Sequence, residues 1–215
     1  KIDIDTTYTI LCKNTAGTVL SRTEEDGVAG ETVTPPVPSF DGYTLSSKDP
    51  ASGSIVLEYS GNVITFIYAP ITYTITYELD GGTNASANPE TYDVTMLPIN
   101  LDDPTKADYT FVSWSNGGTI AVGEFGNKTF TASWAPITYS VTYALNNGTG
   151  SVPSDSGAYA KNSEVNVLFS PLPTRAGYDF LGWSTSSSAT TAEFASGGDT
   201  AFTMGTENVT LYAVW

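Results

Sequence analysis

The chain has 215 residues, of which 40% are hydrophobic and 12% aromatic, so we expect a folded protein and not a disordered one. Its formal net charge is −15, from 23 acidic and 8 basic residues, and such a surface repels phosphate backbones and anionic lipids, which excludes nucleic-acid and membrane-surface binding. One cysteine and no histidine exclude an intrachain disulfide, a histidine-based catalytic triad and a histidine metal site.

The mixture of residue types favours strands over helices. Thr, Ser, β-branched and aromatic residues are abundant, Gly and Pro recur regularly, and only 14% of residues are charged. No apolar run approaches the roughly 18 residues of a membrane span, and no signal-peptide pattern opens the sequence. We therefore expect a β-rich α+β fold with low helix content, no membrane insertion within this sequence, and a chain that is part of a longer protein.

The first predicted strand lies in "TYTILCKNTAGT", residues 7–18. Tyr8, Ile10 and Cys12 occupy alternate positions, which predicts one apolar face. The acidic run Glu24-Glu25-Asp26 follows, and we interpret it as a solvated turn. The segment continues through "SFDGYTL" (39–45) and closes on "TFIYAP" (65–70).

The next strand, "YTITYELDGGT" (73–83), is followed by "PTKADYTFVSW" (104–114) and "TFTASW" (129–134). Its residues alternate between an apolar and a polar face, the pattern of a sheet that is covered on one side. The apolar face carries Tyr73, Ile75, Tyr77 and Leu79, and the polar face carries Thr74, Thr76 and Glu78.

The same three motifs return in the same order as "YSVTYALNNGT" (139–149), "PTRAGYDFLGW" (173–183) and "TLYAVW" (210–215). Such self-similarity predicts repeated modules, with insertions confined to loops. The best helical candidates are Thr191–Ala195 and a turn or so after the first strand of each module, and any helix should be short. The alternation repeats too: Tyr139, Val141, Tyr143 and Leu145 share one face, opposite Ser140, Thr142 and Ala144.

We therefore predict three tandem modules, residues 1–70, 71–136 and 137–215. Each is small enough to bury only about 60% of its chain surface, so packing against its neighbour should help its stability. The linkers Ala69-Pro70 and Ala135-Pro136 are too short for free tumbling, and proline restricts them further. An elongated, semi-rigid rod is the expected arrangement.

The motifs of residues 71–215 resemble two copies of the B-repeat of internalin-type bacterial surface proteins. The resemblance rests on "ITYTITYELDGGT" and "ITYSVTYALNNGT", on "YTFVSW" and "YDFLGW", and on "FTASW" and "LYAVW". Residues 6–70 resemble a mucin-binding-protein (MucBP) module through "YTILCKNTAGTVL", "GETVTPPVPSFDGYTL" and "NVITFIYAP". Cys12 departs from the family pattern, where Tyr or Val is usual, as does "SWSNGGTI" after the central tryptophan.

The resemblance implies β-grasp-like, ubiquitin-related modules between a recognition domain and a cell-wall anchor of a Gram-positive bacterium. It implies an extracellular location on the cell surface, with anchoring through regions outside this sequence. Partners would be host surface glycoproteins, mucin or glycans, with weak self-association between copies. No ligand-contacting residue carries over, because the matching positions are folding positions.

Several residues invite a functional interpretation that their context disfavours. Cys12 aligns with Tyr77 and Tyr143 on the apolar face, so we interpret it as buried and structural, not as a reactive thiol. The four tryptophans repeat at matched positions, which favours packing over a carbohydrate-stacking platform. They are Trp114, Trp134, Trp183 and Trp215.

Polar candidates are weaker still. Asp102-Asp103 lack the apolar pocket that would separate the pKa values of an acid and a base, so we interpret them as solvated. "DGGTN" (80–84) offers oxygen ligands for calcium without the spacing of a known loop. Lys13 and Lys128 are candidates for an internal Lys–Asn isopeptide bond by their position near strands.

The sequence thus predicts a non-catalytic extracellular stalk and adhesion region with no catalytic, cofactor or metal site. It would space a distal recognition domain and make weak, multivalent contacts. Two alternatives stay open: a specific glycan- or mucin-binding domain with a defined pocket, and an accessory region of a large secreted enzyme.

Overall fold

A computed structural model describes residues 4–198 and 200–215, and nearly all of its regular structure is β-strand. Within these residues the only helix is a four-residue 3₁₀ turn, η1 (Ser115–Gly118). The chain divides into two compact units, which are described separately: residues 1–80, 84–104 and 113–132 form one, and residues 81–83, 105–112 and 133–215 form the other. The expectation of a β-rich fold with little helix is confirmed.

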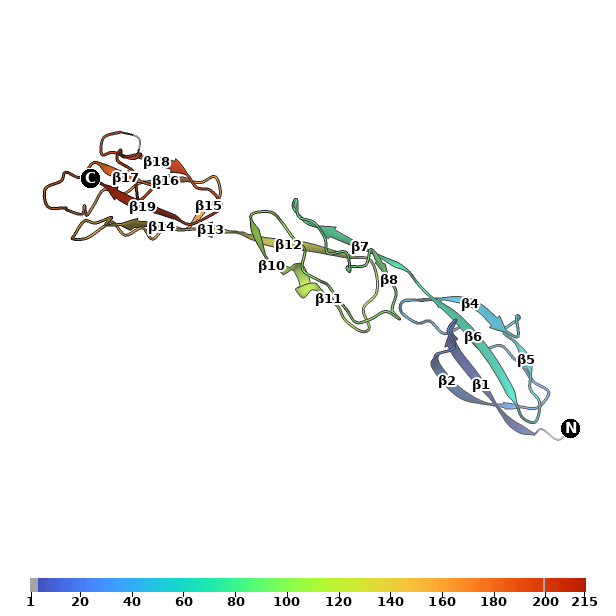
Figure 1. The fold of residues 1–215 in the computed structure, drawn as a ribbon. Helices are drawn as coiled ribbons and strands as arrows, with labels where there is room; N and C mark the ends of the chain where they lie inside the picture. Colours follow the sequence, from blue (N-terminus) through green and yellow to red (C-terminus); the bar gives the residue numbers. More distant parts are fainter. Residues whose placement is uncertain (1–3, 199) are drawn as a thin grey trace. The chain divides into compact units, whose positions relative to one another are not determined.

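The first sheet has the strand order β2-β1-β6-β4 (Figure 1). β1 and β2 form an antiparallel hairpin, whereas β6 returns from far along the chain to lie parallel to β1. Its apolar face packs around Ile10, Cys12, Ile64, Phe66 and Tyr68. The strands are β1 (Asp5–Asn14), β2 (Val19–Val28), β3 (Thr32–Val33), β4 (Tyr43–Asp49), β5 (Ile55–Val56) and β6 (Asn62–Pro70), with β3 and β5 paired separately.

The second sheet repeats this plan with the order β10-β12-β7-β8. Its first and last long strands, β7 and β12, are again parallel, with Thr76 opposite Thr129. The strands are β7 (Tyr73–Glu78), β8 (Thr91–Tyr92), β9 (Ile99–Asn100), β10 (Tyr109–Trp114), β11 (Thr119–Ile120) and β12 (Lys128–Pro136), with β9 and β11 paired separately.

The third set of strands is built around β14 and β19, which are parallel, with β17 antiparallel to β19. Val141, Trp183 and Leu211 are almost fully buried in its core. The strands are β13 (Thr138–Tyr139), β14 (Val141–Ala144), β15 (Tyr159–Ala160), β16 (Glu164–Asn166), β17 (Gly182–Ser184), β18 (Ala201–Thr203) and β19 (Val209–Val214); β13 pairs with β15, and β16 with β18.

The predicted alternation of faces is confirmed in β7, where Ile75 is buried while Thr74 and Thr76 are exposed. It is confirmed in β14, where Val141 and Tyr143 are buried and Thr142 is exposed. Strand periodicity therefore identified the apolar faces correctly.

The predicted helix at Thr191–Ala195 is wrong, because this segment is irregular and is tied to β17. Phe194 is buried, and its backbone exchanges hydrogen bonds with Trp183, its carbonyl accepting at 2.8 Å and its amide donating at 3.0 Å. Glu193 accepts hydrogen bonds from Thr185. Core packing and these bonds hold the segment against β17 in an irregular conformation, against a weak local helical preference.

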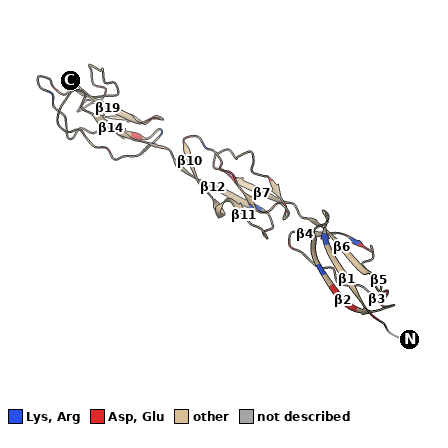
Figure 2. Cartoon of the chain, turned by 60° about the horizontal axis from the view of Figure 1, so that its bottom comes forward, with Lys and Arg blue, Asp and Glu red and all other residues tan. Residues whose placement is uncertain are grey.

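The interpretation of Glu24-Glu25-Asp26 as a turn is also wrong. These residues lie in the exposed edge strand β2, which carries red segments in Figure 2. Glu25 is opposite Tyr8. Acidic side chains on an edge strand oppose its pairing with another chain, because like charges would be brought together. The run therefore protects an edge of the first sheet.

Candidate functional site

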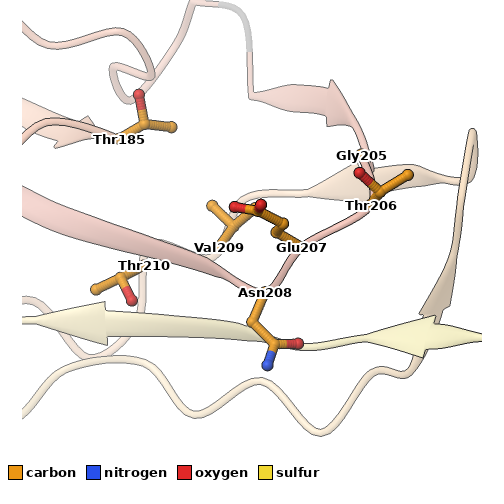
Figure 3. A pocket seen from close by; sticks show the side chains of 7 residues that line it. All are labelled: Thr185, Gly205, Thr206, Glu207, Asn208, Val209 and Thr210. Carbon is orange, nitrogen blue, oxygen red and sulfur yellow. The ribbon is translucent and has the colours of Figure 1, made fainter.

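A shallow hollow of about 380 Å³ lies where β18 leads into β19 (Figure 3). Glu207 supplies its only ionisable side chain, and threonine hydroxyls surround it. One carboxylate among hydroxyls can accept hydrogen bonds from a ligand, but it has no second titratable group with which to divide acid and base roles. The lining residues are Thr185, Gly205, Thr206, Glu207, Asn208, Val209 and Thr210.

The second sheet has a hollow of about 450 Å³ at the matching place, beside the start of β12. Asn127 and Thr129 stand where Asn208 and Thr210 stand in the other hollow. Here the Lys128 ammonium donates to the Glu124 carboxylate at 2.5 Å, and this bond is the main reason that the pKa of Glu124 is lowered. The two hollows therefore share a position but differ in charge.

One side chain of each hollow is committed to the fold. The Asn208 Oδ1 accepts from the Ser140 backbone N–H at 2.9 Å, and the Asn127 Oδ1 accepts from that of Thr74 at 3.0 Å. In the first sheet, Asn62 donates through Nδ2 to the Thr7 carbonyl at 3.0 Å. We call this contact between the start of the last long strand and the first strand the asparagine clip.

The asparagine clip was missed by the sequence reasoning. Its signal was an asparagine at or directly before the start of each closing strand, in "GNVITF", "GNKTFT" and "ENVTLY". In each segment the asparagine side chain bonds to backbone at the first strand, and for Asn62, which is buried, such partners are needed because a buried amide must be hydrogen-bonded.

Cys12 is fully buried beneath the first sheet, as its alignment predicted. Its neighbour Tyr68 donates a hydrogen bond to the Pro38 carbonyl at 2.6 Å. Burial is the main reason that the pKa of Tyr68 is raised to about 12, and Cys12 adds to the shift. The cysteine is therefore part of the core.

The central tryptophans are core residues too. Trp183 is fully buried and Trp114 is 6% exposed. Their indole N–H groups donate to the carbonyls of Leu168 at 3.0 Å and Asp102 at 3.2 Å. Trp215, which is partly buried, donates to the Asn146 carbonyl at 2.8 Å. Packing, and not an open stacking platform, accounts for the positions of Trp114 and Trp183.

The remaining predicted residues do not come together into one site. Asp102 and Asp103 are exposed in a loop, and Asp80 has a left-handed backbone with a φ of 46° in the turn after β7. Lys13 lies half-buried in β1, and Lys128 is paired with Glu124. Over residues 4–198 and 200–215, no group of three or more His, Cys, Asp or Glu side chains is placed to hold a metal ion.

Threonine hydroxyls cover an outward face of the second sheet. Thr76 and Thr129 are exposed partners on β7 and β12, and the Thr131 hydroxyl donates to the Glu78 carboxylate at 2.8 Å. In the third set of strands, the hydroxyl oxygens of Thr142 and Thr210 lie 3.1 Å apart. Such a face can make hydrogen bonds with polar ligands, and these contacts are individually weak.

Within the part of the chain that the structure describes, no helix has the length and apolarity to cross a membrane. The chain is 29% identical over 228 residues to a protein of Evansella cellulosilytica named "Putative membrane protein", an alignment that covers 97% of this chain and 33% of that one. It is 28% identical over 161 residues to a "Putative Gly-rich membrane protein" of the same organism, covering 66% of this chain and 18% of that one. The chain thus spans a third or less of the length of these two relatives.

Residues 73–133 and 139–214 both match the Listeria-Bacteroides repeat domain. These matches cover β7–β11, the first six residues of β12, and all but the first residue of β13–β19, together well over half of the chain. The chain therefore belongs to the Listeria-Bacteroides repeat family.

Proposed function

We propose that the chain is a non-catalytic, load-bearing stalk and adhesion region of an extracellular bacterial surface protein, anchored to the cell wall through regions outside this sequence. Residues 1–70 would be a MucBP-like module, and residues 71–136 and 137–215 two internalin-type B-repeats. The observation that carries the proposal is that the first and last long strands are parallel neighbours in each of the three segments.

Parallel neighbours begin at the same end of a sheet, so a chain that enters on one strand and leaves on the other exits at the opposite end. Tension between the two ends then pulls adjacent strands in opposite directions along their length. Their hydrogen bonds are loaded together and not one after another, and the asparagine clip adds a bond between the same two strands. This arrangement suits a module whose task is to hold a distal recognition domain away from the wall.

The strand order supports β-grasp-like modules arranged as a semi-rigid spacer. The first sheet has an opening antiparallel hairpin, β1–β2, with the last strand β6 inserted beside β1. Prolines at the ends of β6 and β12 restrict the short connections that follow.

Single-molecule pulling on the full chain tests the load-bearing role. Pulling from the two chain ends should give separate unfolding events at high force. In a matched control, handles at Asp5 and Val28, which are opposite each other at the open end of the β1–β2 hairpin, would separate the two strands and break their bonds in sequence, at lower force. Equal forces in the two geometries would refute the proposal.

Adhesion would come from weak, multivalent contacts of the hydroxyl-bearing faces with host surface glycoproteins, mucin or glycans. The alternative is a specific glycan-binding domain, and the hollow beside Glu207 favours it as the place for a defined pocket. A glycan array separates the two. Saturable binding that Glu207→Gln and Thr206→Ala abolish would establish the pocket, whereas weak binding unchanged by either variant supports the stalk.

A third proposal is that the chain is an accessory region of a large secreted enzyme. It is motivated by the two relatives, of which the alignments cover only 33% and 18%. Assay of the full-length protein for hydrolysis of glycans and peptides would test it.

A further inference from the structure

One tight turn recurs in all three segments just before a tyrosine. The tyrosine N–H donates to the carbonyl three residues earlier: Tyr43 to Phe40 at 3.1 Å, Tyr109 to Lys106 at 3.2 Å, and Tyr178 to Arg175 at 3.1 Å. In each case the residue before the tyrosine has a left-handed backbone, with φ values of 77° at Gly42, 65° at Asp108 and 79° at Gly177. We call this the tyrosine turn.

The first two tyrosine turns bind the chain that follows an Ala-Pro linker. The Ile71 N–H donates to the Gly42 carbonyl at 2.8 Å, and the Ile137 N–H donates to the Asp108 carbonyl at 2.9 Å. Each of these bonds lies inside one compact unit. The two junctions therefore contain equivalent backbone hydrogen bonds.

The side chains at the two junctions differ in a matched way. A Cβ on Gly42 would lie 2.2 Å from the Val94 Cγ1, so the valine occupies the space that the glycine leaves. At the other junction the Asp108 Oδ2 accepts from the Lys161 Nζ at 2.8 Å. This bond is the main reason that the pKa of Lys161 is raised.

Val94 and Lys161 occupy equivalent positions. Each stands two residues after a tyrosine that pairs with the first strand of its segment, since Tyr92 is opposite Tyr73 and Tyr159 is opposite Tyr139. A glycine thus faces a branched apolar side chain, and an aspartate faces a lysine. Exchanging one member alone would set a carboxylate against valine or leave the lysine without its carboxylate.

We propose that this pair of residues is a specificity determinant that matches each module to the one that follows it. The backbone hydrogen bond, which is equivalent at both junctions, holds the two modules together. The side-chain pair determines which module fits as the neighbour. The third tyrosine turn carries glycine, and a Cβ on Gly177 would meet nothing within 4 Å. Because glycine is paired with a valine at the first junction, the third tyrosine turn should fit a module with a valine-like side chain at the position of Val94.

A second copy of this chain is a poor occupant for that turn. The residue of the first segment at the position of Val94 is Gly27, two places after Glu25, which is opposite Tyr8. Gly27 has no side chain to fill the space over Gly177, so a further repeat of the second-segment kind is the fitting partner. This inference does not depend on what the stalk binds.

Amide hydrogen exchange of Ile71 and Ile137 in the full chain tests the proposal. Asp108→Lys and Lys161→Asp should each lower the protection of the Ile137 amide, by about two- to fivefold for an exposed ion pair. The double variant, which restores opposite charges, should recover most of it. The Ile71 amide, at the other junction, should be unaffected.

Moving the aspartate–lysine pair from the second junction to the first gives an independent test of the proposal. Gly42→Asp should lower the protection of the Ile71 amide by roughly tenfold or more, because the carboxylate meets Val94, and added Val94→Lys should recover it. Gly177→Asp is the matched control and should leave both amides unchanged. Recovery in neither double variant, or equal effects of Gly177→Asp, would overturn the proposal. Should Gly42→Asp fail to fold, the charge-reversal pair decides alone.

Discussion

Removing the asparagine clip from the first sheet should destabilise it far more than the same change in the other two. Asn62 is only 8% exposed and makes four hydrogen bonds. Its Nδ2 donates to the Thr7 carbonyl at 3.0 Å, the Glu58 carbonyl at 2.9 Å and the Thr6 hydroxyl at 3.4 Å. Its Oδ1 accepts from the Glu58 N–H at 2.8 Å.

The magnitude follows from these contacts. Each hydrogen bond contributes about 1 kcal/mol net, and a buried backbone group left without a partner costs about 1–3 kcal/mol. Some of the freed groups will reach water, so we expect Asn62→Ala to cost about 2–4 kcal/mol of unfolding free energy. At about 1.4 kcal/mol per tenfold change, the sheet would open roughly 30 to 1,000 times more often.

The comparison lies within the same chain. Asn127 and Asn208 are more exposed than Asn62, and their side chains make fewer hydrogen bonds. We therefore expect Asn127→Ala and Asn208→Ala each to lower the free energy of unfolding by about 0.5–1.5 kcal/mol. Exchange of the Ile10 and Ile64 amides reports the first sheet selectively, whereas a single denaturation curve of a multi-module chain does not. Equal effects of all three variants would refute the reasoning.

Three further predictions concern the core. Trp183→Ala should cost about 3–5 kcal/mol in the third set of strands, seen as a lower urea midpoint, whereas an unchanged midpoint would contradict its core role. Gly182→Ala should lower the free energy of unfolding by about 1–3 kcal/mol, because φ is 141° and the new Cβ would lie 2.2 Å from the Phe194 carbonyl oxygen. Its control, Gly205→Ala, places the Cβ in open space and should leave the thermal unfolding midpoint unchanged. Because burial raises the pKa of Tyr68 from 10.0 to about 12, its neutral hydroxyl stabilises the first sheet fully below pH 10, and that stabilisation is lost as the pH rises toward 12. Unfolding midpoints measured over this range should fall more steeply in the parent than in Tyr68→Phe, and parallel curves would exclude the effect.

Local patterns in the sequence were sufficient for the strand faces and the core. Alternation in 73–79 placed Ile75 inside, and the alignment of repeats placed Cys12 and Trp183 inside. These features depend on neighbours two residues apart or on copies of one motif, and both are visible in a single sequence.

Contacts between distant segments could not be predicted in the same way. Asn62 meets Thr7 across 55 positions, and Asp108 meets Lys161 across 53. Such pairs depend on the register of parallel strands and on how one turn meets the next strand, which no local periodicity records. The segment 191–195 failed for a related reason: its conformation is set by Trp183 and Thr185.

The burial of Cys12 makes its thiol a probe of whether the first sheet is folded. Cys12 carries the only thiol in the chain, and this side chain, on the inner face of β1, is completely covered by the residues packed over it. A thiol reagent can therefore react only when that sheet opens, so the rate of modification measures how often this part of the protein loses its structure. The same shielding keeps the native chain from forming disulfide-linked pairs in an oxidising environment.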